Sequence, residues 1–173
     1  LTIDTVQNAT GNGGAIQITG TGSSTELSAS ATNGNLIIQN GLAQYGGAIA
    51  ASSGASDSQI DLSNLASFKL YYNKATTSGG AIYADSGSHA LSLKLGNNVA
   101  LQNNSATAAQ GGAIATINSG SSANTVQIGD GAIMLQNTAN DSGGAIYAET
   151  TSGTGNTSIT IGNTANLQDN QST

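Results

Sequence analysis

Short stretches of the chain alternate between apolar and polar residues. The alternation covers residues 59–62, 92–95, 126–128 and 158–161, where Ile, Leu or Val occupies every second position. A period of two places successive side chains on opposite faces of a β-strand. No window of eleven residues carries an apolar stripe at helical spacing, and Gly, Ser, Thr and Asn are too frequent for stable helices. The pattern therefore predicts short, half-buried strands in an all-β chain.

These strands belong to a repeat of about 33 residues. The tetrapeptide Gly-Gly-Ala-Ile occurs five times, at steps of 33, 33, 32 and 32 residues. Its copies comprise Gly13, Gly14, Ala15, Ile16, Gly46, Gly47, Ala48, Ile49, Gly79, Gly80, Ala81, Ile82, Gly111, Gly112, Ala113, Ile114, Gly143, Gly144, Ala145 and Ile146. A second element, an aliphatic residue followed by two variable residues and Asn, ends at Asn40, Asn73, Asn104, Asn137 and Asn170. Asn8 stands in the same column of the first repeat, with Thr5 in place of the aliphatic residue. Such periodicity is typical of a solenoid.

Each repeat is expected to contain three short strands. The first begins at Gly-Gly-Ala-Ile, the second is the alternating run, and the third ends at the Asn. Three stacked parallel strands per turn describe a right-handed parallel β-helix of about five coils. One β-solenoid would then span residues 1–173. The stretches 52–58, 85–90, 118–125 and 150–157 are rich in Ser, Gly and Thr, and we expect them to form loops at one corner.

The repeated residues favour a scaffold over a ligand site. Glycine can adopt a positive φ at a turn and allows neighbouring coils to approach closely. The repeated Ile should form one internal column, and the repeated Asn should stack as a ladder in which each amide bonds to its neighbour or to turn backbone. The residue after each Ile should face outward, which makes Tyr83 and Tyr147 candidate exposed contacts two coils apart.

Composition narrows the possible functions. The chain has 24 Gly, no Pro, Cys or Trp, and only 15 Ile, 13 Leu, 3 Val and 1 Phe to fill a core. Three Lys, no Arg and nine acidic residues give a net charge of −6, which leaves no basic footprint for nucleic acid. The lack of Cys excludes a disulfide framework and cysteine-based zinc sites. We expect no cofactor and no metal.

Catalysis is a less favoured alternative. A glycosidase needs two carboxylates about 5–9.5 Å apart. The repeat puts Asp85 and Glu149 in one column two coils apart, about 9.6 Å at the usual strand spacing. The single histidine, His89, lies in an expected loop, without the G-x-S-x-G elbow of a serine nucleophile. We therefore expect no enzymatic activity.

At its repeated motifs the sequence resembles the chlamydial polymorphic membrane proteins, which are type V autotransporters of the outer membrane. That family is marked by paired Gly-Gly-Ala-[Ile/Leu/Val] and Phe-x-x-Asn repeats. The first motif matches at all five sites, whereas the second keeps its Asn and replaces its Phe with Thr, Ile, Leu or Met. The resemblance covers residues 8–170.

The resemblance implies a surface-exposed passenger segment that acts as an adhesin toward a host cell-surface receptor, a protein or a glycan. Family members also carry an N-terminal signal and a C-terminal membrane barrel. Neither is recognisable here, so we expect a segment of a longer passenger. The alternatives are a purely structural stalk and a carbohydrate-active β-helix enzyme. Because no polar capping repeat is recognisable, we also expect copies to associate end to end.

Overall fold

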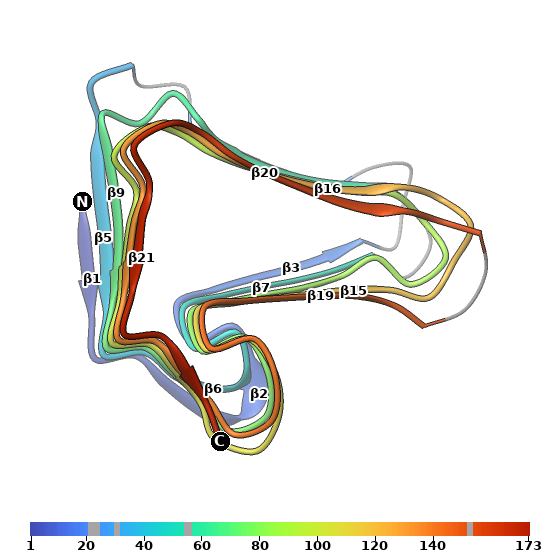
Figure 1. Ribbon diagram of the computed structural model, residues 1–173, viewed down its shortest axis with the longest axis horizontal. Helices are drawn as coiled ribbons and strands as arrows, with labels where there is room; N and C mark the ends of the chain where they lie inside the picture. The colour runs from blue at the N-terminus through green and yellow to red at the C-terminus, as the bar shows by residue number, and fades with distance from the viewer. Residues whose placement is uncertain (21–24, 30–31, 54–56, 152–153) are drawn as a thin grey trace.

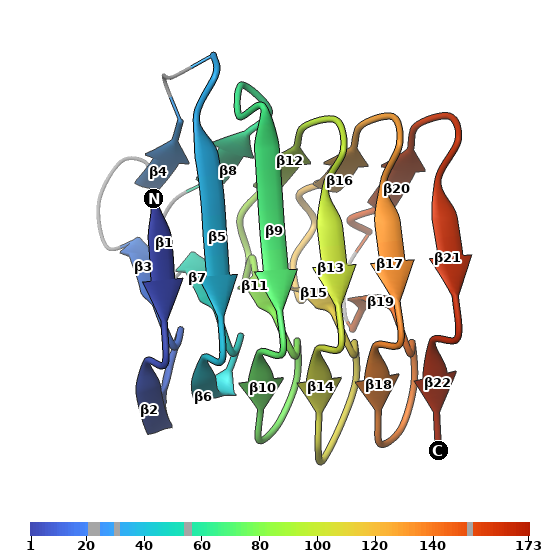
Figure 2. The ribbon, with the colours of Figure 1, turned by 90° about the vertical axis from the view of Figure 1, so that its left-hand side faces the viewer.

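The computed structural model describes residues 1–20, 25–29, 32–53, 57–151 and 154–173. Within these residues the regular elements are all β-strands, and they stack into four parallel sheets, which we call sheets A to D (Figures 1 and 2).

Sheets A and B have six strands each, and sheets C and D have five. Sheet A contains β1 (Thr2–Asp4), β5 (Asn35–Gln39), β9 (Ser67–Tyr71), β13 (Ala100–Gln102), β17 (Ile133–Leu135) and β21 (Asn166–Gln168). Sheet B contains β2 (Gln7–Asn12), β6 (Leu42–Tyr45), β10 (Lys74–Ala75), β14 (Ser105–Ala106), β18 (Thr138–Ala139) and β22 (Gln171–Ser172). Sheet C contains β3 (Ile16–Gly20), β7 (Ile49–Ser53), β11 (Ile82–Asp85), β15 (Ile114–Asn118) and β19 (Ile146–Thr150). Sheet D contains β4 (Thr25–Ser28), β8 (Ser58–Leu62), β12 (Leu91–Leu95), β16 (Asn124–Ile128) and β20 (Thr157–Ile161).

Each coil runs through sheets A, B, C and D in turn before it joins the next coil. In Figure 1 the path descends along sheet A, curls through sheet B, runs outward along sheet C and returns along sheet D. Successive coils then advance along the axis, as Figure 2 shows, so the winding is right-handed. The expected parallel β-solenoid with a period of about 33 residues is confirmed.

The expectation of three strands per coil is wrong, because each full coil has four. Sheet B could not be predicted from the sequence. Four of its six strands, β10, β14, β18 and β22, have only two residues each, which is too short for an alternating pattern to appear. The Gly pair makes the turn before sheet C, as expected, although the strands of sheet C begin at the Ile of each tetrapeptide and not at the Gly pair.

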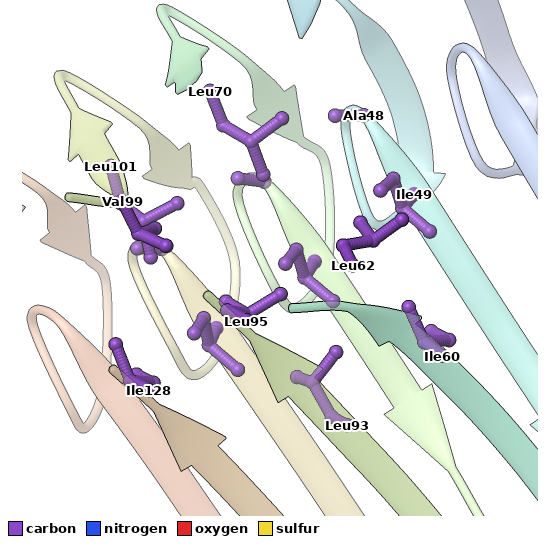
Figure 3. Packing of buried hydrophobic residues seen from close by; sticks show 14 of the residues in the cluster. Ala48, Ile49, Ile60, Leu62, Leu70, Leu93, Leu95, Val99, Leu101 and Ile128 are labelled. Carbon is purple, nitrogen blue, oxygen red and sulfur yellow. The ribbon is translucent and has the colours of Figure 1, made fainter. Parts of the chain in front are cut away.

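The core is built from inward-facing columns in sheets A, C and D. Ile49, Ile82 and Ile114 pair in register across neighbouring coils and are fully buried. Figure 3 shows aliphatic residues of sheets A and D, such as Leu101 and Leu93, among those of sheet C. The expected internal Ile column is therefore confirmed. In the last strands the same inner columns meet solvent, where Ile159 is 41 % and Leu167 is 47 % exposed.

Candidate functional site

The repeated asparagines form a hydrogen-bonded ladder at the corner between sheets A and B. Asn104 donates its Nδ2 to the Oδ1 of Asn137 at 3.0 Å and to the carbonyl of Leu70 at 3.0 Å. Its own Oδ1 accepts the backbone N–H of Asn73 at 3.0 Å and the Nδ2 of Asn73 at 3.1 Å. The same pattern continues from Asn137 to Asn170. Since Asn73, Asn104 and Asn137 are fully buried, the ladder satisfies polar groups that water cannot reach.

Asn40 and Asn8 lie outside this ladder, contrary to expectation. Strand register pairs Ile38, not Ile37, with Leu70, so Gly41 occupies the ladder position of its coil and donates its backbone N–H to Asn73. Asn40 stands one residue earlier with a φ of 55° and donates its Nδ2 to Asp4 at 2.9 Å. Asn8 pairs with Ala43 in sheet B. The sequence allowed this error because both Ile37 and Ile38 are aliphatic.

The two glycines of each pair have different structural roles. Gly79 has a φ of 67°, and the first glycine of every other pair is also left-handed, a conformation that is costly for residues with a Cβ. Gly80 lies against the next coil, where an added Cβ would collide with the carbonyl oxygen of Gly112 and lie 2.5 Å from the backbone nitrogen of Ser105. The tetrapeptide therefore combines a left-handed turn with a close backbone approach, as a scaffold requires.

Tyr83 and Tyr147 lie on the outer face of sheet C, but both are half-buried. The Tyr83 hydroxyl donates to Asp85 at 3.3 Å, and its ring centroid lies 4.7 Å from that of Tyr45. The Tyr147 hydroxyl donates to Glu149 at 2.7 Å. Both phenols are therefore held by a carboxylate two residues further along the same strand, a tyrosine-x-acid spacing that the sequence displays and that our sequence analysis missed.

These neighbours change the titration of the two phenols. The hydrogen bond to Glu149, together with burial and the nearby negative charge, raises the pKa of Tyr147 to about 12. Burial, followed by the charge of Asp85, raises the pKa of Tyr83 further above its ordinary value of 10.0. Both side chains thus remain neutral hydrogen-bond donors at physiological pH, with their hydroxyls already engaged.

The residues considered for catalysis are not assembled with a reactive partner. Asp85 and Glu149 flank Ile117 in one register column, as the repeat predicted, but each binds the tyrosine of its own strand. His89 lies 3.9 Å from Asp57, whose side chain is 70 % exposed. Among the described residues, no three His, Asp or Glu side chains are grouped closely enough to hold a metal ion.

Two segments of the chain match the repeat of a known protein family. Residues 68–85 and 131–149 match the Chlamydia polymorphic membrane protein repeat. The chain carries the repeat of the chlamydial polymorphic membrane proteins, as its motifs indicated. No curated protein and no solved structure gives a significant match. Each polymorphic membrane protein repeat runs from sheet A through the ladder corner and the Gly pair into sheet C.

In these two coils the parts outside the matched repeats are sheet D and the connections on both sides of it. The repeat and the solenoid together fit a surface autotransporter passenger. Among the described residues, no helix has the length and hydrophobicity needed to cross a bilayer.

Proposed function

We propose that this chain is a surface-exposed passenger segment of a bacterial autotransporter and acts as an adhesin that binds host cells. The observation that carries the proposal is the polymorphic membrane protein repeat, found in two coils of one continuous solenoid. The partner would be a receptor on the host cell surface, and no enzymatic step is involved. The repeated glycines and asparagines would support binding indirectly, by holding the coils in register.

The geometry supports contact through the sides of the solenoid. Stacked coils present four sheets whose outer side chains recur at the strand spacing of about 4.8 Å, and among the described residues no other segment lies over sheet A in Figure 2. Such a surface can add several weak contacts, and display of many copies on one bacterium multiplies them. Affinity per copy can therefore be low while adhesion remains firm.

The test is a bead-binding assay on cultured epithelial cells. Beads coated with the folded chain should bind cells, and an excess of the soluble chain should displace them. Beads coated with the Gly79→Val/Gly80→Val variant, which should not fold, serve as the matched control and should not bind. If the folded chain neither binds cells nor competes with coated beads, the adhesin proposal is wrong and the structural stalk becomes the better interpretation.

A further inference from the structure

The outer faces of sheets A and D differ in chemistry although their inner faces are alike. Both sheets point aliphatic residues inward in register. The outward positions of sheet D carry only polar side chains: Glu26, Ser28, Gln59, Asp61, Ser92, Lys94, Thr125, Gln127, Ser158 and Thr160. The outward positions in the four central strands of sheet A are mixed: Ile37, Tyr71, Ala100, Ile133 and Leu135 lie beside Asn35, Gln39, Ser67, Lys69 and Gln102.

Two of the five large apolar side chains that are exposed among the described residues lie in or beside the inner strands of sheet A. Tyr72, which directly follows β9, is 60 % exposed, and Ile133 is 37 % exposed. The other large apolar side chains exposed among the described residues, Leu1, Ile159 and Leu167, lie in or beside the first or last strand of a sheet, where the coil stack stops. Tyr72 and Ile133 therefore need a separate explanation, since exposed apolar surface in the middle of a polar molecule is typical of a contact site.

A single cation lies within this mixed surface of apolar and uncharged polar side chains. Lys69 occupies the outward column between Ile37 and Ala100. Within the described residues no carboxylate lies close enough to form an ion pair with Lys69, whereas Lys94 on sheet D lies 3.8 Å from Asp61. In a chain with a net charge of −6, an unpaired ammonium among apolar neighbours is complementary to an incoming carboxylate.

We infer that the sheet A face, formed by Ile37, Lys69, Tyr71, Tyr72, Ile133 and Leu135, is the surface that contacts the host receptor. The partner that fits it is a protein surface with apolar side chains around a carboxylate, which would lie opposite Lys69. This inference rests on the proposed adhesin function and identifies its contact surface. It places the contact on sheet A instead of at Tyr83 and Tyr147, whose hydroxyls are engaged by their own carboxylates.

The size of the face sets the expected strength of binding. The four strands β5, β9, β13 and β17, with three to five residues each, cover on the order of 250 Å² at standard strand spacing and rise. A stable interface usually buries about 800 Å² on each partner. A single contact should therefore be weak, so binding must be measured with many copies on one bead.

The first experiment compares matched variants of two faces in the bead assay. The sheet A variant is Tyr71→Ser/Tyr72→Ser/Ile133→Gln, and the sheet C control, Tyr83→Ser/Tyr147→Ser/Ile117→Gln, likewise loses two tyrosines and one isoleucine. Circular dichroism and melting establish that both are folded. We expect the sheet A variant to reduce bead binding at least tenfold and the control to reduce it less than twofold. Equal binding by the sheet A variant and the parent, or a larger loss in the control, overturns the inference.

The second experiment tests the charge without removing apolar residues. Lys69→Glu should reduce bead binding at least tenfold, and Lys69→Met about threefold, because Met keeps the apolar stem but not the charge. Lys74→Glu, a matched change on sheet B, should leave binding unchanged. If Lys69→Glu binds like the parent, no carboxylate faces this lysine and the assigned partner chemistry is wrong.

The third experiment asks whether the receptor is a protein. Cells treated with trypsin should lose bead binding, whereas cells whose glycans are oxidised with periodate should retain it. The reverse result identifies a glycan and overturns the assignment of a protein partner. If parent beads bind no cells at all, the adhesin proposal itself fails, and that result is distinct from the loss of binding in sheet A variants alone.

Discussion

Two corners of each coil differ in the length of the connection between their strands. At the asparagine corner, between sheets A and B, every connection has two residues, and the first is left-handed: Thr5, Asn40, Tyr72, Asn103, Gln136 and Asp169. At the loop corner, between sheets C and D, connections 86–90, 119–123 and 151–156 have five or six residues. The sequence is repetitive at the asparagine corner and variable at the loop corner.

Two buried asparagines show the difference at the level of single bonds. Asn104 at the asparagine corner bonds to groups in the coils before and after its own. Asn118 at the loop corner donates its Nδ2 to the carbonyl of Ser122 at 2.6 Å and accepts the backbone N–H of Gly120 at 2.9 Å. Both side chains are fully buried, but only the first joins coils. The buried asparagines of the asparagine corner therefore contribute to cohesion along the axis, and Asn118 orders its own loop. Bonds between coils at the loop corner come from other side chains, such as Ser119 and Ser122, which donate to the carbonyls of Gly87 and Ser88.

The largest loss of stability should come from substituting Gly80, the glycine that lies against the next coil. Gly80→Ala should lower the free energy of unfolding by about 4 kcal/mol or more, because the added Cβ collides with backbone that cannot move away cheaply. Ser121→Ala, at an exposed position of the loop corner, should change it by less than about 0.5 kcal/mol. Urea melts followed by circular dichroism measure both. Similar midpoints for Gly80→Ala and the parent would show that close packing at this corner is dispensable.

The next largest loss of stability should come from removing side-chain bonds between coils, which we compare with bonds within one coil. Asn104→Ala should cost about 2–4 kcal/mol, because it removes the partners of the buried Asn73 N–H and Leu70 carbonyl in the preceding coil and one bond to Asn137 in the next. Asn118→Ala should cost about 1 kcal/mol, since its two side-chain bonds stay within one loop. Thermal melts of both variants measure the difference. A cost for Asn118→Ala equal to that for Asn104→Ala would remove the distinction between the two corners.

The register of the ladder marks the limit of prediction from sequence. The repeat of Gly-Gly-Ala-Ile was enough to establish parallel coils, the inward Ile column and the stacking of Asn73, Asn104 and Asn137. In the early coils, Ile37 and Ile38 are adjacent and both apolar, so pattern alone could not decide which one faces inward. In the structure Ile38 pairs with Leu70 and is buried, so Asn40 does not lie in the asparagine ladder.

Other features were not encoded in any periodic signal. Two-residue strands leave no alternation, so sheet B was invisible in the sequence. The sheet A face could not be predicted from the sequence either. In each strand successive side chains point to opposite sides of the sheet, and the apolar residues of this face are recognised only when the outward set is known in all four strands. That assignment follows only when the register of every strand is known.

The third prediction concerns the pH dependence of stability, which should differ between the asparagine ladder and the tyrosine of sheet C. The ladder contains only amides and does not titrate, whereas the Tyr147 hydroxyl is held by Glu149 and its pKa is raised to about 12. An unfolded tyrosine has a pKa of about 10. The stabilisation is therefore fully present below pH 10 and is lost as pH rises from 10 to 12. Solvent screening limits it to about 1 kcal/mol.

The measurement is the unfolding midpoint of the parent and of Tyr147→Phe at pH 8 to 12. Tyr147→Phe should be less stable than the parent at pH 8, and the gap should close toward pH 12, because Phe cannot lose a proton. Asn104→Ala should keep a constant gap over the same range, since no amide titrates there. A gap for Tyr147→Phe that does not narrow would mean that its hydroxyl does not favour the folded chain.

The smallest effect should come from changing the length of a loop. One Gly inserted after Ser121 lengthens the connection 119–123 to six residues, which is the length of 151–156. It should change the unfolding free energy by less than about 0.5 kcal/mol, because loop entropy depends weakly on length. One Gly inserted after Gln102 instead disturbs a corner that has two residues in every coil, moves Asn104 off its partners and should cost at least as much as Asn104→Ala. Urea melts of the two insertions compare the corners directly, with the added residue identical and only its place different. Equal costs would show that the constant length of the asparagine corner does not reflect bonding between coils.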